Sequence, residues 1–162
     1  MTIGLVEAMM LNRRAAAERI LDATLPDAWP GRALIERAFA ASLEAIREEP
    51  AVRLWGDRVM IARTGPRRVL GSVVFHGAPT GDGAVEIAYG VEEVSQRQGY
   101  ASEAVLASVA WALEQPGVTA IRAVTPSWHV ASKRVLEKCG LTMVDTRDSD
   151  MLGELHEYEL RR

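Results

Sequence analysis

The fold of this chain is decided by the stretch Gln96-Arg97-Gln98-Gly99-Tyr100-Ala101. It follows a strand-like run at 85–91 and precedes a helix-like run at 101–114. A short turn from a strand into a helix presents backbone N–H groups without helical partners, where the helix dipole adds positive potential. Gly99 lets the backbone approach a phosphate without a Cβ in the way, and Ala101 keeps the first turn small. The stretch therefore predicts a loop that binds a phosphorylated cofactor.

The chain has 162 residues, so we expect a single domain over 1–162 with a hydrophobic core. Hydrophobic residues make up 48% and charged residues 25%, and the net charge of −3 argues against a nucleic-acid surface. Cys139 is the only cysteine, so no disulfide forms within the chain, and no metal site is expected. Because the sequence contains no apolar run of roughly 18 residues and no signal-peptide pattern, we expect a cytoplasmic protein that does not bind membranes. We expect it to be a monomer or a homodimer.

The spacing of apolar residues predicts the order helix, helix, three strands, helix, strand, helix, two strands. The predicted helices cover 5–21, 32–48, 101–114 and 130–139. The predicted strands cover 52–62, 68–75, 84–91, 118–124, 141–146 and 154–160, with the last two joined around 147–150. Ser127 is the expected N-cap of the last helix and Gly140 its C′ residue. Helices that cross between strands require a parallel pair, so the order predicts an α+β domain in three α/β/α layers with a mixed sheet.

The strand at 84–91 carries the candidate reactive group. Period-two alternation gives it one face with Val85, Ile87, Tyr89 and Val91 and another with Glu86, Ala88 and Gly90. A carboxylate beside two small residues indicates a face left open for a ligand, and a glycine inside a strand often marks a close backbone approach. The alternative for Glu86 is an ordinary, partly exposed strand residue.

From Glu86 to Leu141 the chain resembles the GNAT superfamily of acetyltransferases, and most closely its branch of ribosomal-protein N-terminal acetyltransferases. The stretch 96–101 matches the family's acetyl-CoA signature, Q/R-x-x-G-x-G/A. Similar segments are the strand 86–91, the helix start Tyr100-Ala101-Ser102-Glu103-Ala104, and Ala131-Ser132-Lys133-Arg134-Val135-Leu136-Glu137-Lys138-Cys139-Gly140-Leu141. The resemblance also covers the element order over nearly the whole chain.

The resemblance implies a mostly antiparallel sheet that splays beside Gly90, with acetyl-CoA bound in the opening. It implies that the pantetheine arm pairs with the backbone of Tyr89, Gly90 and Val91. The pyrophosphate would lie on the loop formed by Gln96, Arg97, Gln98, Gly99, Tyr100 and Ala101, mainly on backbone amides. The thioester would then point toward Glu86 and Ser132.

Two positions depart from the family's pattern. His129 stands where the family usually has asparagine, and it is a candidate contact of the cofactor. Leu136 stands where many members place a tyrosine that protonates the leaving thiolate, so Ser132 is the candidate substitute for that acid. For both His129 and Ser132, a purely structural role is the alternative.

The implied reaction is acetyl transfer from acetyl-CoA to a primary amine by direct attack in a ternary complex. Glu86, acting through a water, is the expected base. His76 and Trp29 are expected with Glu86 on the acceptor side, near loops that carry Asp22, Asp27, Asp148 and Asp150. The acceptor stays open between protein N-termini, as in ribosomal proteins, and small-molecule amines, including antibiotics and polyamines.

Two other functions are compatible with parts of the sequence. A GNAT-fold module could bind acetyl-CoA without catalysis, as a sensor or partner subunit, and Leu136 at the tyrosine position favours this alternative. A dinucleotide-binding oxidoreductase is disfavoured, because the chain contains no G-x-G-x-x-G motif and opens with two helices.

Overall fold

The computed structural model describes residues 2–27 and 54–162. The helix predicted at 32–48 and the candidate Trp29 lie outside these residues. Two compact units divide the chain, one made of 1–74 and 90–98 and the other of 75–89 and 99–162. In the described ranges, no helix has both the length and the apolar character needed to span a bilayer. The single-domain and cytoplasmic assignments stay predictions.

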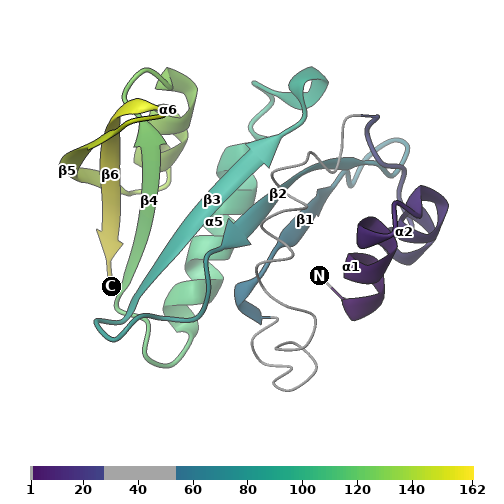
Figure 1. Ribbon diagram of the computed structural model, residues 1–162, viewed down its shortest axis with the longest axis horizontal. Helices are drawn as coiled ribbons and strands as arrows, with labels where there is room; N and C mark the ends of the chain where they lie inside the picture. The colour runs from purple at the N-terminus through teal and green to yellow at the C-terminus, as the bar shows by residue number, and fades with distance from the viewer. Residues whose placement is uncertain (1, 28–53) are drawn as a thin grey trace. The chain divides into compact units, whose positions relative to one another are not determined.

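Six strands hydrogen-bond in the order β1-β2-β3-β4-β6-β5, which confirms the predicted mixed sheet and α+β class (Figure 1). Their bounds are β1 Arg58–Ile61, β2 Val69–Phe75, β3 Ala84–Val91, β4 Ala120–Pro126, β5 Thr142–Ser149 and β6 Gly153–Arg161. The pairs β1–β2, β4–β6 and β5–β6 are antiparallel and β3–β4 is parallel. The sheet is therefore mostly antiparallel, as the resemblance implies.

The first unit opens with two short helices, α1 Ile3–Met10 and α2 Arg14–Leu21, where the apolar spacing predicted one helix over 5–21. The prediction of one helix was wrong because the chain turns at Asn12, whose φ of +50° lies in the left-handed region that asparagine tolerates. The buried core of this unit joins both helices to β2 and comprises Leu5, Ala8, Met9, Ala17, Ala23, Leu25, Val69 and Val74.

Gly71 allows β2 and β3 to approach closely within the first unit. A Cβ on Gly71 would stand 2.0 Å from the carbonyl oxygen of Gly90, and Gly71 has a φ of +154°. This contact is shorter than any real Cβ makes, so the backbone of β3 requires glycine at position 71. The close backbone approach expected at Gly90 is therefore real, with Gly71 as the residue that permits it.

In the second unit, β3 and β4 pair over only part of their lengths. The parallel register joins Ala84–Ala120, Val85–Ile121 and Glu86–Arg122, and no later pair follows between these two strands. β3 nevertheless continues to Val91 and β4 to Pro126, and Figure 1 shows the two arrows diverging. The strands thus part after Glu86, four residues before the position expected for the splay.

Helix α5, Tyr100–Glu114, follows the stretch 96–101 as predicted, after the short 3₁₀ helix η2 at Glu93–Ser95. It buries a stripe of small and β-branched side chains made of Ser102, Val105, Ser108, Val109 and Ala112. Near its end, the rings of Phe75 and Trp111 lie with centroids 5.6 Å apart. Small residues let the helix pack closely, which fixes the position of its N-terminus.

Helix α6, Val130–Lys138, is capped by His129 and not by the predicted Ser127. The chain makes one more turn after β4, in which the N–H of His129 donates to the carbonyl of Pro126. At the other end, Gly140 has a φ of +87°, its N–H donates to Glu137, and that of Leu141 donates to Leu136. This is a Schellman motif, which confirms Gly140 as the C′ residue.

The final hairpin turns later than expected. Arg147, Asp148 and Ser149 were predicted to form the turn, but they extend β5 and pair with Leu155, Glu154 and Gly153. The chain reverses at 150–152, and Gly153 with a φ of +73° supplies the left-handed residue that starts β6.

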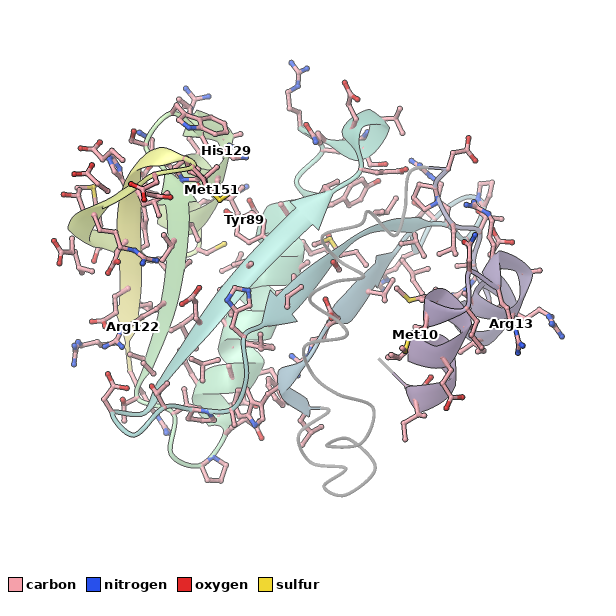
Figure 2. All side chains as sticks on the ribbon, viewed as in Figure 1. Met10, Arg13, Tyr89, Arg122, His129 and Met151 are labelled. Atoms are coloured by element: carbon pink, nitrogen blue, oxygen red, sulfur yellow. The ribbon has the colours of Figure 1, made fainter. Side chains whose placement is uncertain are left out.

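An ion-pair cluster ties the β3–β4 end of the second unit to the last strand. Arg122 donates to Glu159 at 2.9 Å and to Asp82 at 2.9 Å, and Arg161 donates to Glu159 at 2.6 Å. The Glu159 side chain is only 9% exposed, so this carboxylate depends on its two arginines for compensation. Figure 2 labels Arg122 on β4.

Candidate active site

Glu86 forms a pair with His76 on the second unit, at the last position where β3 pairs with β4. Nδ1 of His76 lies 2.9 Å from Oε1 of Glu86, and the side chains are 37% and 44% exposed. The backbone N–H of His76 also donates to the carbonyl of Glu86 at 2.9 Å, so the two residues are direct cross-strand neighbours. Two of the predicted acceptor-side residues are thus brought together.

The pKa of Glu86 is held below its usual value. The hydrogen bond from His76 is the largest cause, partial burial opposes it, and the positive charges of His76 and Arg147 add to the lowering. The carboxylate is therefore ionised at neutral pH, and an ionised carboxylate only accepts hydrogen bonds. It follows that Nδ1 of His76 carries the proton that this bond requires.

Tyr89 and Ser132 form a second pair in the same unit. The phenol oxygen of Tyr89 lies 2.9 Å from the Ser132 hydroxyl oxygen and 3.0 Å from the Ser132 carbonyl. Burial raises the pKa of Tyr89 to about 12, against a smaller lowering by the Ser132 hydrogen bond. The phenol therefore stays protonated at neutral pH. The sequence pattern predicted only a backbone role for Tyr89 and did not indicate the hydrogen bond of its side chain.

His129 lies beside this pair but uses its ring to cap α6. Its Nδ1 accepts a hydrogen bond from the N–H of Ser132 at 3.3 Å, and Figure 2 shows His129 at the start of that helix. The ring stacks on Trp128 with an interplanar angle of 2° and a centroid distance of 5.6 Å. Trp128 is 64% exposed and donates through its indole N–H to Leu152 at 3.3 Å. One ring nitrogen of His129 is thus structural, and its cofactor contact stays a prediction.

The backbone of the stretch 96–101 turns sharply before α5. Arg97 has a φ of +59° and Gly99, the residue that precedes the helix, has a φ of +89°. No side chain in the described ranges caps the N-terminus of α5, so none of them engages the N–H groups of its first turn. Successive turned amides of this kind form a concavity that binds anions. The stretch therefore has the local backbone geometry expected of a phosphate loop.

The two glutamine side chains of this stretch are bound to the chain's own backbone. Gln96 donates to the carbonyl of Val91 at 3.1 Å, and Gln98 donates to that of Val94 at 3.3 Å. These bonds engage the side-chain amides of Gln96 and Gln98, and none is formed by the guanidinium of Arg97 among the described residues. The first unit holds Gly90, Val91 and 96–98, whereas the second unit holds Gly99, which precedes α5, and the first two residues of that helix, Tyr100 and Ala101.

Buried polar groups support the residues that precede the loop. Ser95 is fully buried, accepts a hydrogen bond from Arg68 at 2.9 Å and donates to Glu92 at 2.5 Å. Arg68 also forms an ion pair with Glu92. This triad, unrecognised in the sequence, fixes η2 against β2, since each charge has its partner.

Leu136 and Cys139 have core positions on α6. Leu136 is 1% exposed and Cys139 is 4% exposed. Burial raises the pKa of the Cys139 thiol, which lies 3.6 Å from the carbonyl of Ser102. A residue at position 136 therefore faces the core, so the tyrosine of the family's pattern has no place there in this chain.

Comparison with known proteins identifies the family of this chain. Residues 6–142 match the family model described as the acetyltransferase (GNAT) domain. An acetyltransferase of the GNAT family from Bacillus anthracis is 23% identical with a TM-score of 0.53, covering 58% of this chain and 59% of that chain. No curated protein matches the sequence.

Two further solved structures cover nearly the whole chain. The ribosomal-protein-S5-alanine acetyltransferase from Vibrio fischeri is 14% identical with a TM-score of 0.67, covering 98% of this chain and 86% of that chain. An aminoglycoside acetyltransferase in complex with coenzyme A is 16% identical with a TM-score of 0.63, covering 100% and 92%. At these identities the likeness shows a shared fold.

Proposed function

The chain belongs to the GNAT family of acetyl-CoA-dependent N-acetyltransferases, and from that premise we propose that it acetylates a primary amine by direct attack in a ternary complex. The amine is a protein N-terminal α-amine or a small-molecule amine. Acetyl-CoA lies along the edge of β3 that no longer pairs with β4, where backbone groups are available to the pantetheine arm. The diphosphate lies on the turned amides of the stretch 96–101.

One observation carries this proposal: two pairs of titratable or hydroxyl groups stand on β3 where its pairing with β4 ends. The His76–Glu86 pair marks the last paired residue, and Tyr89 with Ser132 follows three residues later. Acetyl transfer needs a group that removes a proton from the amine and another that protonates the leaving thiolate. The first pair supplies the base and the second pair the acid.

The reaction also needs stabilisation of the oxyanion that forms on the thioester carbonyl. A backbone N–H of β3 in the region 89–91 provides this hydrogen bond. Binding both reactants side by side contributes much of the acceleration, because it replaces a bimolecular encounter with a positioned one. The sequence assigned the base to Glu86 alone, whereas the bond from His76 makes the two residues one unit.

The demands on the base favour an acceptor with an α-amine. An α-amino group has a pKa near 7.8, so roughly a quarter of it is neutral at cytosolic pH, whereas a lysine amine is about three units more basic. Relatives by fold include an alanine acetyltransferase of a ribosomal protein, an aminoglycoside acetyltransferase and a spermidine N-acetyltransferase from Vibrio cholerae. The acceptor panel therefore contains all three kinds of amine.

Thiol release from acetyl-CoA tests the function. The protein is incubated with peptides that begin with alanine or serine, with aminoglycosides and with polyamines, and product is confirmed by mass spectrometry. Turnover with at least one amine above the rate of hydrolysis supports the proposal. Binding of coenzyme A in calorimetry without turnover on any amine supports a non-catalytic sensor, which Leu136 in the core also fits. No heat with coenzyme A at all contradicts both functions.

A further inference from the structure

We propose that His76, and not Glu86, takes the proton from the acceptor amine, and that Glu86 acts as the positioning residue that orients and polarises the imidazole. This assignment rests on the proposed function and names the base of that same site. It differs from the sequence-based expectation, in which Glu86 itself works through a water.

The hydrogen bond between the two residues sets their roles. Oε1 of Glu86 accepts from Nδ1 of His76 at 2.9 Å, so the lone pair of the neutral imidazole lies on Nε2. Among the described residues, no hydrogen bond engages Nε2. The ring is also 37% exposed, which leaves this nitrogen accessible to an incoming amine. A carboxylate behind an imidazole is the arrangement that holds the tautomer and stabilises the imidazolium once it forms.

The basicity of the two groups favours the same assignment of roles to His76 and Glu86. An ordinary imidazole is a stronger base than an ordinary carboxylate by about two pKa units. The pKa of Glu86 is lowered further by its bond from His76 and by Arg147, which faces it from β5. Arg147 is also paired with Glu157 of β6, whose carboxylate lies 2.9 Å from its Nε. The lowered pKa makes the Glu86 carboxylate a weaker base than an ordinary carboxylate, which fits it for orienting the imidazole.

The protons balance across the reaction. An ammonium acceptor R–NH₃⁺ gives one proton to Nε2 of His76, and Glu86 keeps its negative charge beside the imidazolium. The neutral amine forms the C–N bond with the thioester carbonyl carbon, and the C–S bond breaks with its electron pair on sulfur. The thiolate takes a proton from the Ser132 hydroxyl, which regains one from the nitrogen of the tetrahedral intermediate. His76 releases its proton to solvent, so the products are the amide, coenzyme A thiol and one proton.

Opposite rankings of two variants distinguish the candidate bases. If His76 is the base, H76Q lowers kcat/KM by about 10²-fold or more, whereas E86Q, whose amide oxygen still accepts from Nδ1, lowers it only about tenfold. In H76A, added imidazole restores turnover in a saturable way. H76Q also loses less activity with a weakly basic aromatic amine, which is already neutral. E86Q still requires His76, so the double variant is no slower than H76Q.

The chain offers a matched control in a second imidazole–carboxylate pair. Nε2 of His156 lies 3.0 Å from Oε1 of Glu154 on β6, within the same unit. H156Q and E154Q make the same chemical changes and are expected to keep the parent kcat/KM within about threefold. Thermal unfolding of all four variants checks that none is unfolded in the assay.

Three outcomes overturn the assignment. One is a larger loss in E86Q than in H76Q, which makes Glu86 the base. Another is no rescue of H76A by imidazole together with an equal loss on basic and weakly basic amines. The third is activity near that of the parent in both variants, which makes the pair a structural cross-strand contact. If the parent itself binds coenzyme A but acetylates no amine, the proposed function fails as well, and this result is distinct from the three above.

Discussion

The phenol oxygen of Tyr89 lies 2.9 Å from the hydroxyl oxygen of Ser132, although the two residues are 43 positions apart in the sequence. The pair joins β3 to the first turn of α6 after β3 and β4 have stopped pairing. Because the pKa of Tyr89 is raised to about 12, its phenol remains a hydrogen-bond donor at neutral pH. The single phenol proton is within reach of both the carbonyl and the hydroxyl oxygen of Ser132, and when it is donated to the hydroxyl oxygen, the Ser132 proton is available for a thiolate.

Removing either hydroxyl is expected to slow the breakdown of the tetrahedral intermediate. S132A lowers kcat by about 10²-fold and Y89F by about tenfold, since Ser132 is the direct donor and Tyr89 acts through it. An acetyl thioester of a more acidic thiol needs less protonation of its leaving group. Both losses of kcat are therefore expected to be smaller with this thioester than with acetyl-CoA. Steady-state kinetics with the two acetyl donors measures the difference.

Tyr158 provides the control for this pair. It is a buried tyrosine of the same unit whose hydroxyl donates to Glu137 at 3.4 Å. In Y158F, the ratio of the kcat values with the two acetyl thioesters is expected to equal that of the parent. If S132A loses equal activity with both thioesters, Ser132 is not the acid.

The buried position of Leu136 predicts that a tyrosine there restores nothing. L136Y places a larger side chain where the native one is 1% exposed, so it is expected to lower the free energy of unfolding by about 1–3 kcal/mol. L136A lowers it by about 2–5 kcal/mol through the cavity it leaves. Chemical denaturation measures both values, and S132A/L136Y is expected to be no faster than S132A. Recovery of activity in that double variant would contradict the position of Leu136 in the core.

Binding of coenzyme A is expected to depend on the backbone of the stretch 96–101 more than on its side chains. G99V forces a β-branched residue to a φ of +89°, although no described atom lies within 4 Å of a Cβ there. It is therefore expected to weaken coenzyme A binding by tenfold or more, through the altered amides. R97A keeps the left-handed backbone without the guanidinium and changes Kd by less than about threefold. Calorimetry decides, and a larger loss in R97A would assign the phosphate contact to the side chain.

The ion-pair cluster around Glu159 predicts how stability depends on acid pH. Hydrogen bonding from Arg122, then from Arg161, keeps the pKa of Glu159 below its ordinary value against the effect of burial. A group whose pKa is lower in the folded state stabilises the protein above its unfolded-state pKa, near 4.3, and loses that contribution as the pH falls through the folded-state value.

The free energy of unfolding is thus expected to be level from pH 7 to about pH 5 and to decrease below that range. Asp82, whose pKa is lowered to about 2 chiefly by its hydrogen bond from Thr80, adds to the decrease at the acid end. E159Q is expected to cost about 1–3 kcal/mol at pH 7 and to flatten the acid decrease. Urea unfolding at several pH values measures this, and an unchanged profile in E159Q would place the titrating groups elsewhere.

Local patterns in the sequence were sufficient for most elements of the fold. Alternation found β3 over its full length, and Gly140 marked the end of α6 because a left-handed residue there needs no context. Errors arose where a turn had several candidate residues. Asn12 was overlooked inside a helical pattern, and Arg147 was assigned to a turn although its pairing with Leu155 extends β5.

The candidate site was predicted as a set of residues but not as pairs. Glu86 and His76 flank a turn at 77–83 whose register is decided by the sheet, so their hydrogen bond was beyond the strand pattern alone. The link between Tyr89 and Ser132 depends on how α6 packs, which periodicity does not report. Alternation predicted which face of β3 carries Tyr89, whereas the tertiary structure determines that its hydroxyl pairs with Ser132.

The indole of Trp128 gives the molecule a built-in optical reporter. It is mostly solvent-exposed and parallel to the ring of His129, which caps the helix that carries Ser132. A change in the stacking of the indole on the imidazole changes the emission of a tryptophan. Events at the start of α6 can therefore be followed by fluorescence on the unlabelled chain, with W128F as the reference that gives the emission of the other three tryptophans.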